Sequence, residues 1–311
     1  MSSKNALRLL VLVGPTGSGK STLAIRLCKE LPGEVISADS RYLYQELNIG
    51  TAKPNPAELA SVAHHLINVT TLDAPWSLGV FQKETRRLIE DINDRGKLPL
   101  LVGGTGQYIR AILQNWEIPA QAPLDDLRKA IEAWGERIGF DALHGRLARL
   151  DAEAAAWIDY RNKRRTIRAL EVIFASGKRF TELRTKSSSP YQTLVLGLEW
   201  PREQLYQRID ARINAMLAQG FVEEVSALRE AGRAAQLRRM GIIGYPEILD
   251  YLDNKITLDE AVTLIRRNTR IYVRRQANWF KLTDPTIHWV NAADPAVAEH
   301  MLDLIKSEFP V

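Results

Sequence analysis

The chain has 311 residues, of which 45% are hydrophobic and 25% are charged, and its net charge of +5 accompanies an isoelectric point near 9.2. This length suits one large or two medium domains, and no apolar run is long enough for a membrane span. The single cysteine, Cys28, excludes an internal disulfide, so we expect a cytoplasmic protein without a membrane segment.

The first predicted element is a buried strand at Leu9–Val13, followed by a glycine-rich loop and a helix. The loop is Gly14-Pro15-Thr16-Gly17-Ser18-Gly19-Lys20-Ser21. Its glycines let backbone N–H groups converge on an anion, and the helix N-terminus adds partial positive charge. Lys20 supplies a full charge, and the Ser21 hydroxyl is a suitable ligand for Mg²⁺. The pattern predicts a phosphate or diphosphate site and leaves the reaction open.

Two further strands are predicted at Glu34–Ser40 and Leu98–Val102. Chemistry gathers at the carboxyl ends of parallel strands, so we expect Asp39 beside the phosphate loop. The second strand leads into Gly103-Gly104-Thr105-Gly106, which is either a second wall of the same cleft or only a tight turn. Hydrolytic P-loop proteins commonly carry a Mg²⁺-binding Asp at such a strand end. Thr105 stands here instead, which leaves Asp39 as the well-placed carboxylate.

The segments between these strands carry weaker signals. We expect irregular structure at His64–Ile67 and Thr70–Pro75, and a helix at Ser77–Arg95 that Gly96 ends. The two adjacent histidines have no further ligands at metal spacing, so a zinc site is not expected there.

The composition changes after Trp116. Residues 118–123 resemble a linker, and helices are predicted at 124–138, 141–150, 152–158 and 164–176. A buried strand returns at Thr193–Leu198. We therefore predict an α/β fold with a P-loop NTPase-like parallel sheet core, a mostly helical insertion and C-terminal helices. The core would comprise residues 1–117 and 191–311, and the insertion residues 118–190.

Positive charge is concentrated in the second half of the chain. The stretch between Arg161 and Lys186 contains nine Lys and Arg residues and only two acidic residues, both Glu. The predicted helices 202–217 and 258–280 carry arginines at four-residue spacing: Arg208 and Arg212 on the first, and Arg266, Arg270 and Arg274 on the second. This pattern indicates a polyanionic partner, with solvated helix faces as the alternative. Trp279 and Phe280 suit either base stacking or a core position.

Nine separated motifs occur together over about residues 9–290, and with them the chain resembles the bacterial tRNA dimethylallyltransferases. The motifs are Gly14–Ser21, Ile36–Ser40, Ile49–Pro54, His64–Leu66, Val102–Gly106, Arg168–Val172, Arg208–Arg212, Ile243–Tyr245 and Arg274–Gln276. The resemblance implies transfer of a dimethylallyl group from its diphosphate to N6 of the adenine on the 3′ side of the anticodon. The tRNAs would be those that read codons beginning with U, and diphosphate would be released.

The resemblance also implies roles for residues. Asp39 would be the base that takes the N6 proton, and Thr105 would hold the amino group. The diphosphate would bind to Gly14, Pro15, Thr16, Gly17, Ser18, Gly19, Lys20, Ser21, Arg208 and Arg212, with Mg²⁺ on Ser21. The tRNA anticodon arm would contact Asp39, Ser40, Arg41, Tyr42, Thr105, Arg128, Arg164, Arg165, Thr166, Ile167 and Arg168. We expect a monomer.

Three positions depart from the family pattern: Tyr42 replaces a Gln, Asp159-Tyr160-Arg161-Asn162 replaces His-Pro-Asn-Asp, and Pro246 replaces a basic residue. Pro246 suits the first turn of a helix.

Three other functions fit parts of the pattern: an isopentenyltransferase acting on free AMP, ADP or ATP, a small-molecule or nucleoside kinase, and a non-enzymatic RNA-binding P-loop protein.

Overall fold

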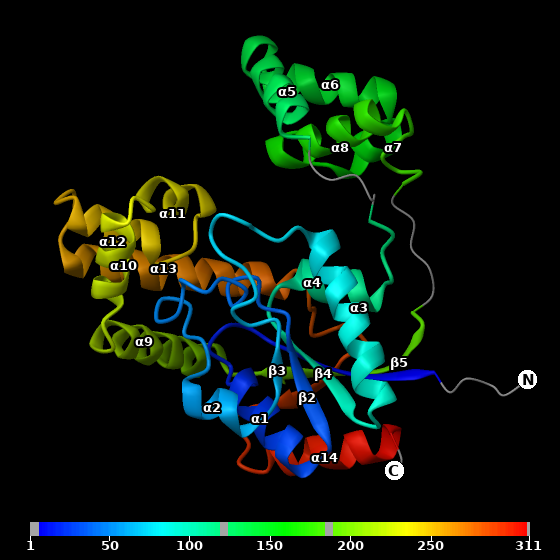
Figure 1. The fold of residues 1–311 in the computed structure, drawn as a ribbon, viewed down its shortest axis with the longest axis vertical. Helices are drawn as coiled ribbons and strands as arrows, with labels where there is room; N and C mark the ends of the chain where they lie inside the picture. Colours follow the sequence, from blue (N-terminus) through cyan, green and yellow to red (C-terminus); the bar gives the residue numbers. More distant parts are fainter. Residues whose placement is uncertain (1–5, 119–123, 184–188, 310–311) are drawn as a thin grey trace, which may run out of the picture. The chain divides into compact units, whose positions relative to one another are not determined.

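The computed structural model describes residues 6–118, 124–183 and 189–309, and the chain forms two compact units (Figure 1). The first unit is Met1–Leu113 with Pro190–Val311, and the second is Gln114–Ser189. Residues 119–123 of the predicted linker lie outside the described residues, as do Arg184 and Lys186 of the basic cluster. The role of the helical insertion as a tRNA-binding domain stays a prediction.

The first unit is built on a six-stranded sheet in the order β3-β2-β4-β1-β5-β6, and every pairing is parallel. The strands are β1 (Leu7–Val13), β2 (Gly33–Ser37), β3 (His64–His65), β4 (Leu98–Gly103), β5 (Tyr191–Glu199) and β6 (His288–Asn291). Val13 pairs in register with Gly103, and Ser37 with Val102. The loops after β1, β2 and β4 therefore leave the sheet at the same edge. The predicted α/β fold with a parallel sheet is confirmed.

Helices cover both faces of the sheet. One face packs on α3 (Leu78–Asp94) and α4 (Gly106–Leu113), and the other on α1 (Lys20–Glu30) and α14 (Val297–Glu308) (Figure 1). Alternate residues of β1 serve the two cores: Leu9 and Val11 lie in the first cluster, and Leu10 and Leu12 in the second. Burial on both faces explains why β1 is apolar without alternation.

Five further helices of the first unit enclose a third core. They are α9 (Arg202–Ala218), α10 (Phe221–Glu230), α11 (Ala234–Met240), α12 (Tyr245–Leu252) and α13 (Leu258–Ala277). Pro246 lies in the first turn of α12, as expected. Tyr44, Leu47 and Leu72, which follow β2 in the chain, are buried in this core with the helices. The loop after β2 is thus attached to the C-terminal helices, although the two are far apart in the sequence.

The second unit contains only helices among its described residues. They are α5 (Asp125–Ile138), α6 (Phe140–Leu150), α7 (Ala152–Trp157) and α8 (Lys163–Ser176), and they share a core of their own. In the stretch that departs from the family pattern, Asp159 pairs with Arg161 at 2.7 Å, and Asn162 caps α8 by accepting the N–H of Arg165.

Two local predictions were wrong. His64–His65 is not irregular but forms the edge strand β3, paired with Val35 and Ile36. The stretch Gly103–Gly106, for which either a second wall of the cleft or a tight turn was expected, ends β4 and begins α4 at Gly106, and Gly103 and Gly104 line the cavity described below. Helix α13 ends at Ala277, three residues earlier than predicted, and Phe280 is buried in the core with the sheet, so it is not available for base stacking. A short helix that had not been predicted, α2 (Pro56–Ser61), is capped by Asn55.

Strand β2, the neighbour of the edge strand β3, carries a buried carboxylate. The Glu34 side chain is 4% exposed and pairs with Lys97 and His65, each at 2.8 Å, and with Arg95. Hydrogen bonds from Arg95 are the main cause that holds the pKa of Glu34 well below its usual range, and Lys97 and His65 act in the same direction. His65 thereby attaches β3 to the rest of the sheet.

We predict that Glu34→Gln lowers the free energy of unfolding at pH 7 by about 2 kcal/mol, because charge-assisted hydrogen bonds are lost. A carboxylate with a lowered folded pKa stabilises the protein above its unfolded pKa of about 4.3, and the effect disappears as the pH falls below that. Urea unfolding at pH 7 and in acid should therefore show the gap between wild type and variant closing in acid. Asp91→Asn, at a half-exposed partner of Arg95, is the control, and an equal effect there would contradict the prediction.

Candidate active site

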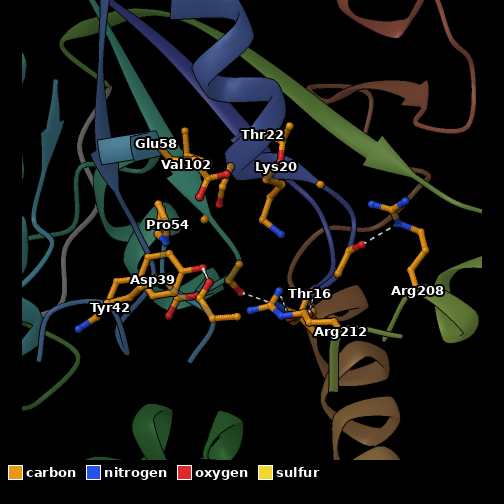
Figure 2. A pocket seen from close by; sticks show the side chains of 18 of the residues that line it. Thr16, Lys20, Thr22, Asp39, Tyr42, Pro54, Glu58, Val102, Arg208 and Arg212 are labelled. Carbon is orange, nitrogen blue, oxygen red and sulfur yellow. Dashed lines mark hydrogen bonds between the residues drawn. The ribbon is translucent and has the colours of Figure 1, made fainter. Parts of the chain in front are cut away.

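A cavity of about 430 Å³ lies at the carboxyl ends of the central strands (Figure 2). It brings together the phosphate loop, Asp39, which lies two residues after β2, the glycine turn after β4 and the facing sides of α9 and α13. Its lining consists of Thr16, Gly17, Gly19, Lys20, Ser21, Thr22, Asp39, Tyr42, Ala52, Lys53, Pro54, Glu58, Val102, Gly103, Gly104, Arg208, Ala211, Arg212, Tyr272 and Gln276.

The phosphate loop has the backbone shape that its glycines predict. Gly17 and Gly19 have φ values of +79° and +90°, which side chains of other residues rarely tolerate. A Cβ on Gly17 would also approach Ile209 of α9 to 3.0 Å. The loop therefore needs glycine both for its turn and for its contact with α9. Gly14, Pro15 and the buried Ser18 shape the loop without lining the cavity.

Lys20 begins α1 and is directed into the phosphate loop. Its Nζ donates to the carbonyls of Gly14 at 2.9 Å and Pro15 at 2.7 Å. Burial lowers the pKa of Lys20 to about 7, Asp39 opposes this shift and Arg212 adds to it. The Lys20 ammonium group thus experiences opposing electrostatic effects from a carboxylate and a second cation, and a bound anion would favour its charged form.

Helix α9 supplies two more cations, as the sequence predicted. Arg212 donates to the carbonyl of Thr51 at 2.9 Å and to the Thr16 hydroxyl at 3.5 Å. Arg208 donates to the carbonyl of Gly17 at 3.0 Å and lies over the ring of Trp200, 4.3 Å from its centroid. Figure 2 shows both guanidinium groups beside the phosphate loop.

Asp39 lines the cavity on the side opposite Arg208, and its Oδ1 accepts the backbone N–H of Arg41 at 2.9 Å (Figure 2). Tyr42 also lines the cavity, although it is 9% exposed, and its hydroxyl donates to the carbonyl of Ala52 at 2.9 Å. Ser40, Arg41 and Thr105 do not line it. The Thr105 hydroxyl accepts the N–H of Ser40 at 3.2 Å, so it is joined to the segment that carries Asp39.

The predicted tRNA contacts of the second unit fall into three groups. Arg164 and Arg165 are exposed on α8. Thr166 and Ile167 are buried, at 0% and 5% exposure, which disfavours a contact between their side chains and RNA. Arg128 and Arg168 pair with Glu171, at 2.8 Å and 3.1 Å, and the Glu171 side chain is 1% exposed. The last pair of arginines therefore balances a buried carboxylate, which sequence reasoning did not anticipate.

The arginine stripe of α13, meaning the arginines at four-residue spacing Arg266, Arg270 and Arg274, is also partly paired with other side chains. Arg270 donates to Asp210 at 2.6 Å, and Arg266 donates to Asn214 at 2.8 Å, so both are bound to α9. Arg274 and Arg275, nearer the end of the helix, are exposed. Only the latter part of the stripe suits the predicted phosphate contacts.

Sequence reasoning missed Gln276, which joins two walls of the cavity. Its Oε1 accepts the N–H of Thr16 at 2.9 Å, and its Nε2 donates to the carbonyl of Gly104 at 3.1 Å. The Arg274–Gln276 motif was a usable signal, but its spacing gave no chemical role. Tyr272, one turn earlier on α13, is 37% exposed and lines the cavity near Asp39.

No cluster of three or more His, Cys, Asp or Glu residues that could hold a metal ion occurs in residues 6–118, 124–183 or 189–309. A Mg²⁺ ion at a phosphate loop needs no such cluster, because a hydroxyl, phosphate oxygens and water complete its coordination. Ser21 lines the cavity at the start of α1 and fits that requirement.

Comparison with known proteins identifies related sequences and structures. The sequence model of the IPP transferase family matches residues 42–283. The chain is similar to the tRNA dimethylallyltransferase of Roseiflexus sp. strain RS-1, with 47% identity over 88% of this chain and 90% of the relative. The corresponding protein of Roseiflexus castenholzii is 44% identical over 97% of this chain and 98% of the relative.

Two solved structures are similar over nearly the whole chain. The tRNA isopentenylpyrophosphate transferase of Bacillus halodurans is 35% identical with a TM-score of 0.69, and the match covers 97% of this chain and 96% of the other. A eukaryotic dimethylallyltransferase acting on tRNA is 28% identical with a TM-score of 0.81, over 97% of this chain and 79% of the other.

We predict that the affinity for inorganic diphosphate weakens as the pH rises above about 7, because Lys20 then loses its proton in the free protein. The dissociation constant should rise by up to about tenfold per pH unit above that value, less the opposing effect of the ligand's own ionisation. Isothermal calorimetry from pH 6 to pH 9 measures it. Lys20→Met should bind weakly throughout and lack this dependence, and the same pH profile in both proteins would exclude Lys20 as the titrating group.

Proposed function

This chain belongs to the IPP transferase family, and we propose that it transfers a dimethylallyl group from dimethylallyl diphosphate to a tRNA. The acceptor is N6 of the adenine on the 3′ side of the anticodon, in tRNAs that read codons beginning with U. The observation that carries the proposal is one cavity that contains both a phosphate loop and Asp39, with threonine rather than a carboxylate after β4. This combination suits removal of a diphosphate group better than hydrolysis by activated water.

In the proposed reaction, N6 of adenine attacks the carbon of the dimethylallyl group that bears the diphosphate. A carbon–nitrogen bond forms, the carbon–oxygen bond breaks, and its electron pair leaves with the diphosphate. The N6 lone pair is delocalised into the ring, so the nitrogen needs a base, and Asp39 takes its proton. Lys20, Arg208, Arg212 and the Thr16 hydroxyl stabilise the negative charge that develops on the departing diphosphate.

Thr105 acts beside Asp39 in this scheme. Its hydroxyl accepts the N–H of Ser40, the residue after the proposed base, and donates to the Ser40 hydroxyl, so its second lone pair remains for a hydrogen bond from the adenine amino group. Tyr42 is hydrogen-bonded to Ala52, so it forms part of the wall of the cavity, in place of the family's Gln. The half-exposed ring of Tyr272 offers an apolar face to the prenyl group or to the base.

Mg²⁺ would be held by Ser21 and, when bound, would neutralise part of the charge of the diphosphate. The protein's own residues shape the site and supply the remaining positive charge for the diphosphate. Gln276 orients the phosphate loop through the N–H of Thr16, and Lys20 lies within reach of an anion on the same loop.

The target adenine must leave its stack to enter the cavity, at a cost of a few kcal/mol that is smallest in an unpaired loop. Contacts with the anticodon arm offset this cost, and the exposed Arg164 and Arg165 are the strongest candidates in the second unit.

A tRNA substrate and a chain with one cysteine suit the cytoplasm. No helix in the described parts of the chain could cross a lipid bilayer, and the monomeric state stays a prediction.

We predict that the protein, incubated with dimethylallyl diphosphate, Mg²⁺ and unmodified tRNA, prenylates one adenine per acceptor tRNA. Asp39→Asn should lower kcat by about a hundredfold to ten-thousandfold, because the base is lost, and leave the affinity for tRNA nearly unchanged. Mass spectrometry of nucleosides measures the product. Glu58→Gln, at the other carboxylate that lines the cavity, is the control.

The same assay separates the other functions. Product on AMP, ADP or ATP but not on tRNA would favour a mononucleotide prenyltransferase, and phosphoryl transfer from ATP would favour a kinase. Binding of tRNA with no prenyl incorporation across a full tRNA pool would leave only an RNA-binding role.

We predict that Arg164→Ala and Arg165→Ala weaken tRNA binding and each reduce the slope of log K against log salt by about one. Filter binding between low and moderate salt measures this slope. Arg128→Ala should instead lower thermal stability, because Glu171 loses a partner at 2.8 Å. A full salt slope in the Arg164 and Arg165 variants would rule out phosphate contacts at these positions.

A further inference from the structure

One carboxylate outside the cavity organises the loop that forms a wall of it. Glu224 lies on α10 and accepts three consecutive backbone N–H groups: those of Asn48 at 3.0 Å, Ile49 at 2.7 Å and Gly50 at 3.1 Å. The hydroxyl of Tyr245 donates to the same carboxylate at 2.7 Å. Four donors converge on one negative charge, which is the arrangement that usually surrounds a bound anion.

Side-chain packing fixes the same stretch. A Cβ on Gly50 would lie 2.1 Å from the ring of Phe221 and 2.8 Å from that of Tyr245. The backbone of Gly50 is therefore pressed against α10 and α12, and Phe221 and Tyr245 are themselves fully buried. Residues 48–54, called here the 48–54 loop, are thus anchored at their beginning by charge and by close contact.

The other end of this loop reaches the proposed diphosphate site. Immediately after the anchored residues, the carbonyl of Thr51 accepts a hydrogen bond from Arg212 at 2.9 Å, and the carbonyl of Ala52 accepts one from Tyr42. Ala52 has a φ of +50°, an unfavourable value for alanine that a loosely held loop would relax. Ala52, Lys53 and Pro54 then line the cavity.

We propose that Glu224 is a positioning residue for diphosphate binding, acting through the 48–54 loop on Arg212 and Tyr42. The inference rests on the proposed function. Glu224 does not line the cavity, so it touches no substrate. Its charge holds three N–H groups so that the next two carbonyls fix the guanidinium of Arg212 and the ring of Tyr42. A glutamine there has one acceptor oxygen for four donors, so the loop would lose part of its anchor.

The central test compares Glu224→Gln with Glu223→Gln, its exposed neighbour on α10. At saturating tRNA, Glu224→Gln should raise the KM for dimethylallyl diphosphate about tenfold, since hydrogen bonds to a charged group are lost. The KM for tRNA should change less than about twofold, and Glu223→Gln should match wild type. Equal increases in both KM values, or no increase in a folded Glu224→Gln, would overturn the proposal.

A double-mutant cycle with Arg212→Lys tests whether Glu224 acts through Arg212. If it does, Glu224→Gln should have little further effect on the KM in a protein that already carries Arg212→Lys. Independent roles would instead give multiplied effects on the KM and would count against the proposal. Should Glu224→Gln fail to fold, Tyr245→Phe removes one donor to the same carboxylate. It should raise the same KM by about threefold, and wild-type values in this variant would overturn the proposal.

Calorimetry with inorganic diphosphate separates this inference from the proposed function. It needs no prenyl transfer, so weaker diphosphate binding in Glu224→Gln would support the positioning role even if wild type fails to modify tRNA. Unchanged binding in an active, folded variant would contradict the positioning role and leave the proposed function intact.

Discussion

Three cations share one small cavity, and their mutual repulsion must be balanced before any substrate arrives. Each is hydrogen-bonded to main-chain carbonyls: Lys20 to Gly14 and Pro15, Arg208 to Gly17, and Arg212 to Thr51. Partial negative charge on carbonyls stabilises the cations at short range without neutralising them. The site therefore keeps its positive potential for a diphosphate, and this depends on the phosphate loop and the 48–54 loop holding their carbonyls in place.

That requirement explains the arrangement of the first unit. The parallel sheet delivers the phosphate loop and Asp39 to one edge, but it supplies only one of the three cations. The other two come from α9, and the loop after β2 is buried against α9, α10 and α12. Helices that would otherwise be an appendage to the sheet thus complete the anion site, which is why the site draws on residues from Thr16 to Gln276.

The sequence allowed much of this to be predicted, and most of the predictions that failed or were missed concern contacts between distant parts of the chain. The strand, loop and helix at residues 7–30 follow from a continuous apolar run and glycines, which are local signals. The pairing of Arg128 and Arg168 with Glu171 joins distant positions, and so does the role of Gln276. An arginine has the same appearance in a sequence whether it faces RNA or a buried carboxylate. Strand β3 escaped prediction because two residues are too few to show alternation.

The contact between Gln276 and the turn after β4 has a consequence for sequence divergence. A Cβ on Gly104 would lie 2.2 Å from the Nε2 of Gln276, whose amide oxygen also accepts the hydrogen bond from the N–H of Thr16. Alanine at 104 would push the amide away from the phosphate loop, and a shorter residue at 276 would leave that N–H without its acceptor. Neither position can change alone without disturbing the anion site. The two residues, 172 positions apart, should therefore vary together or not at all.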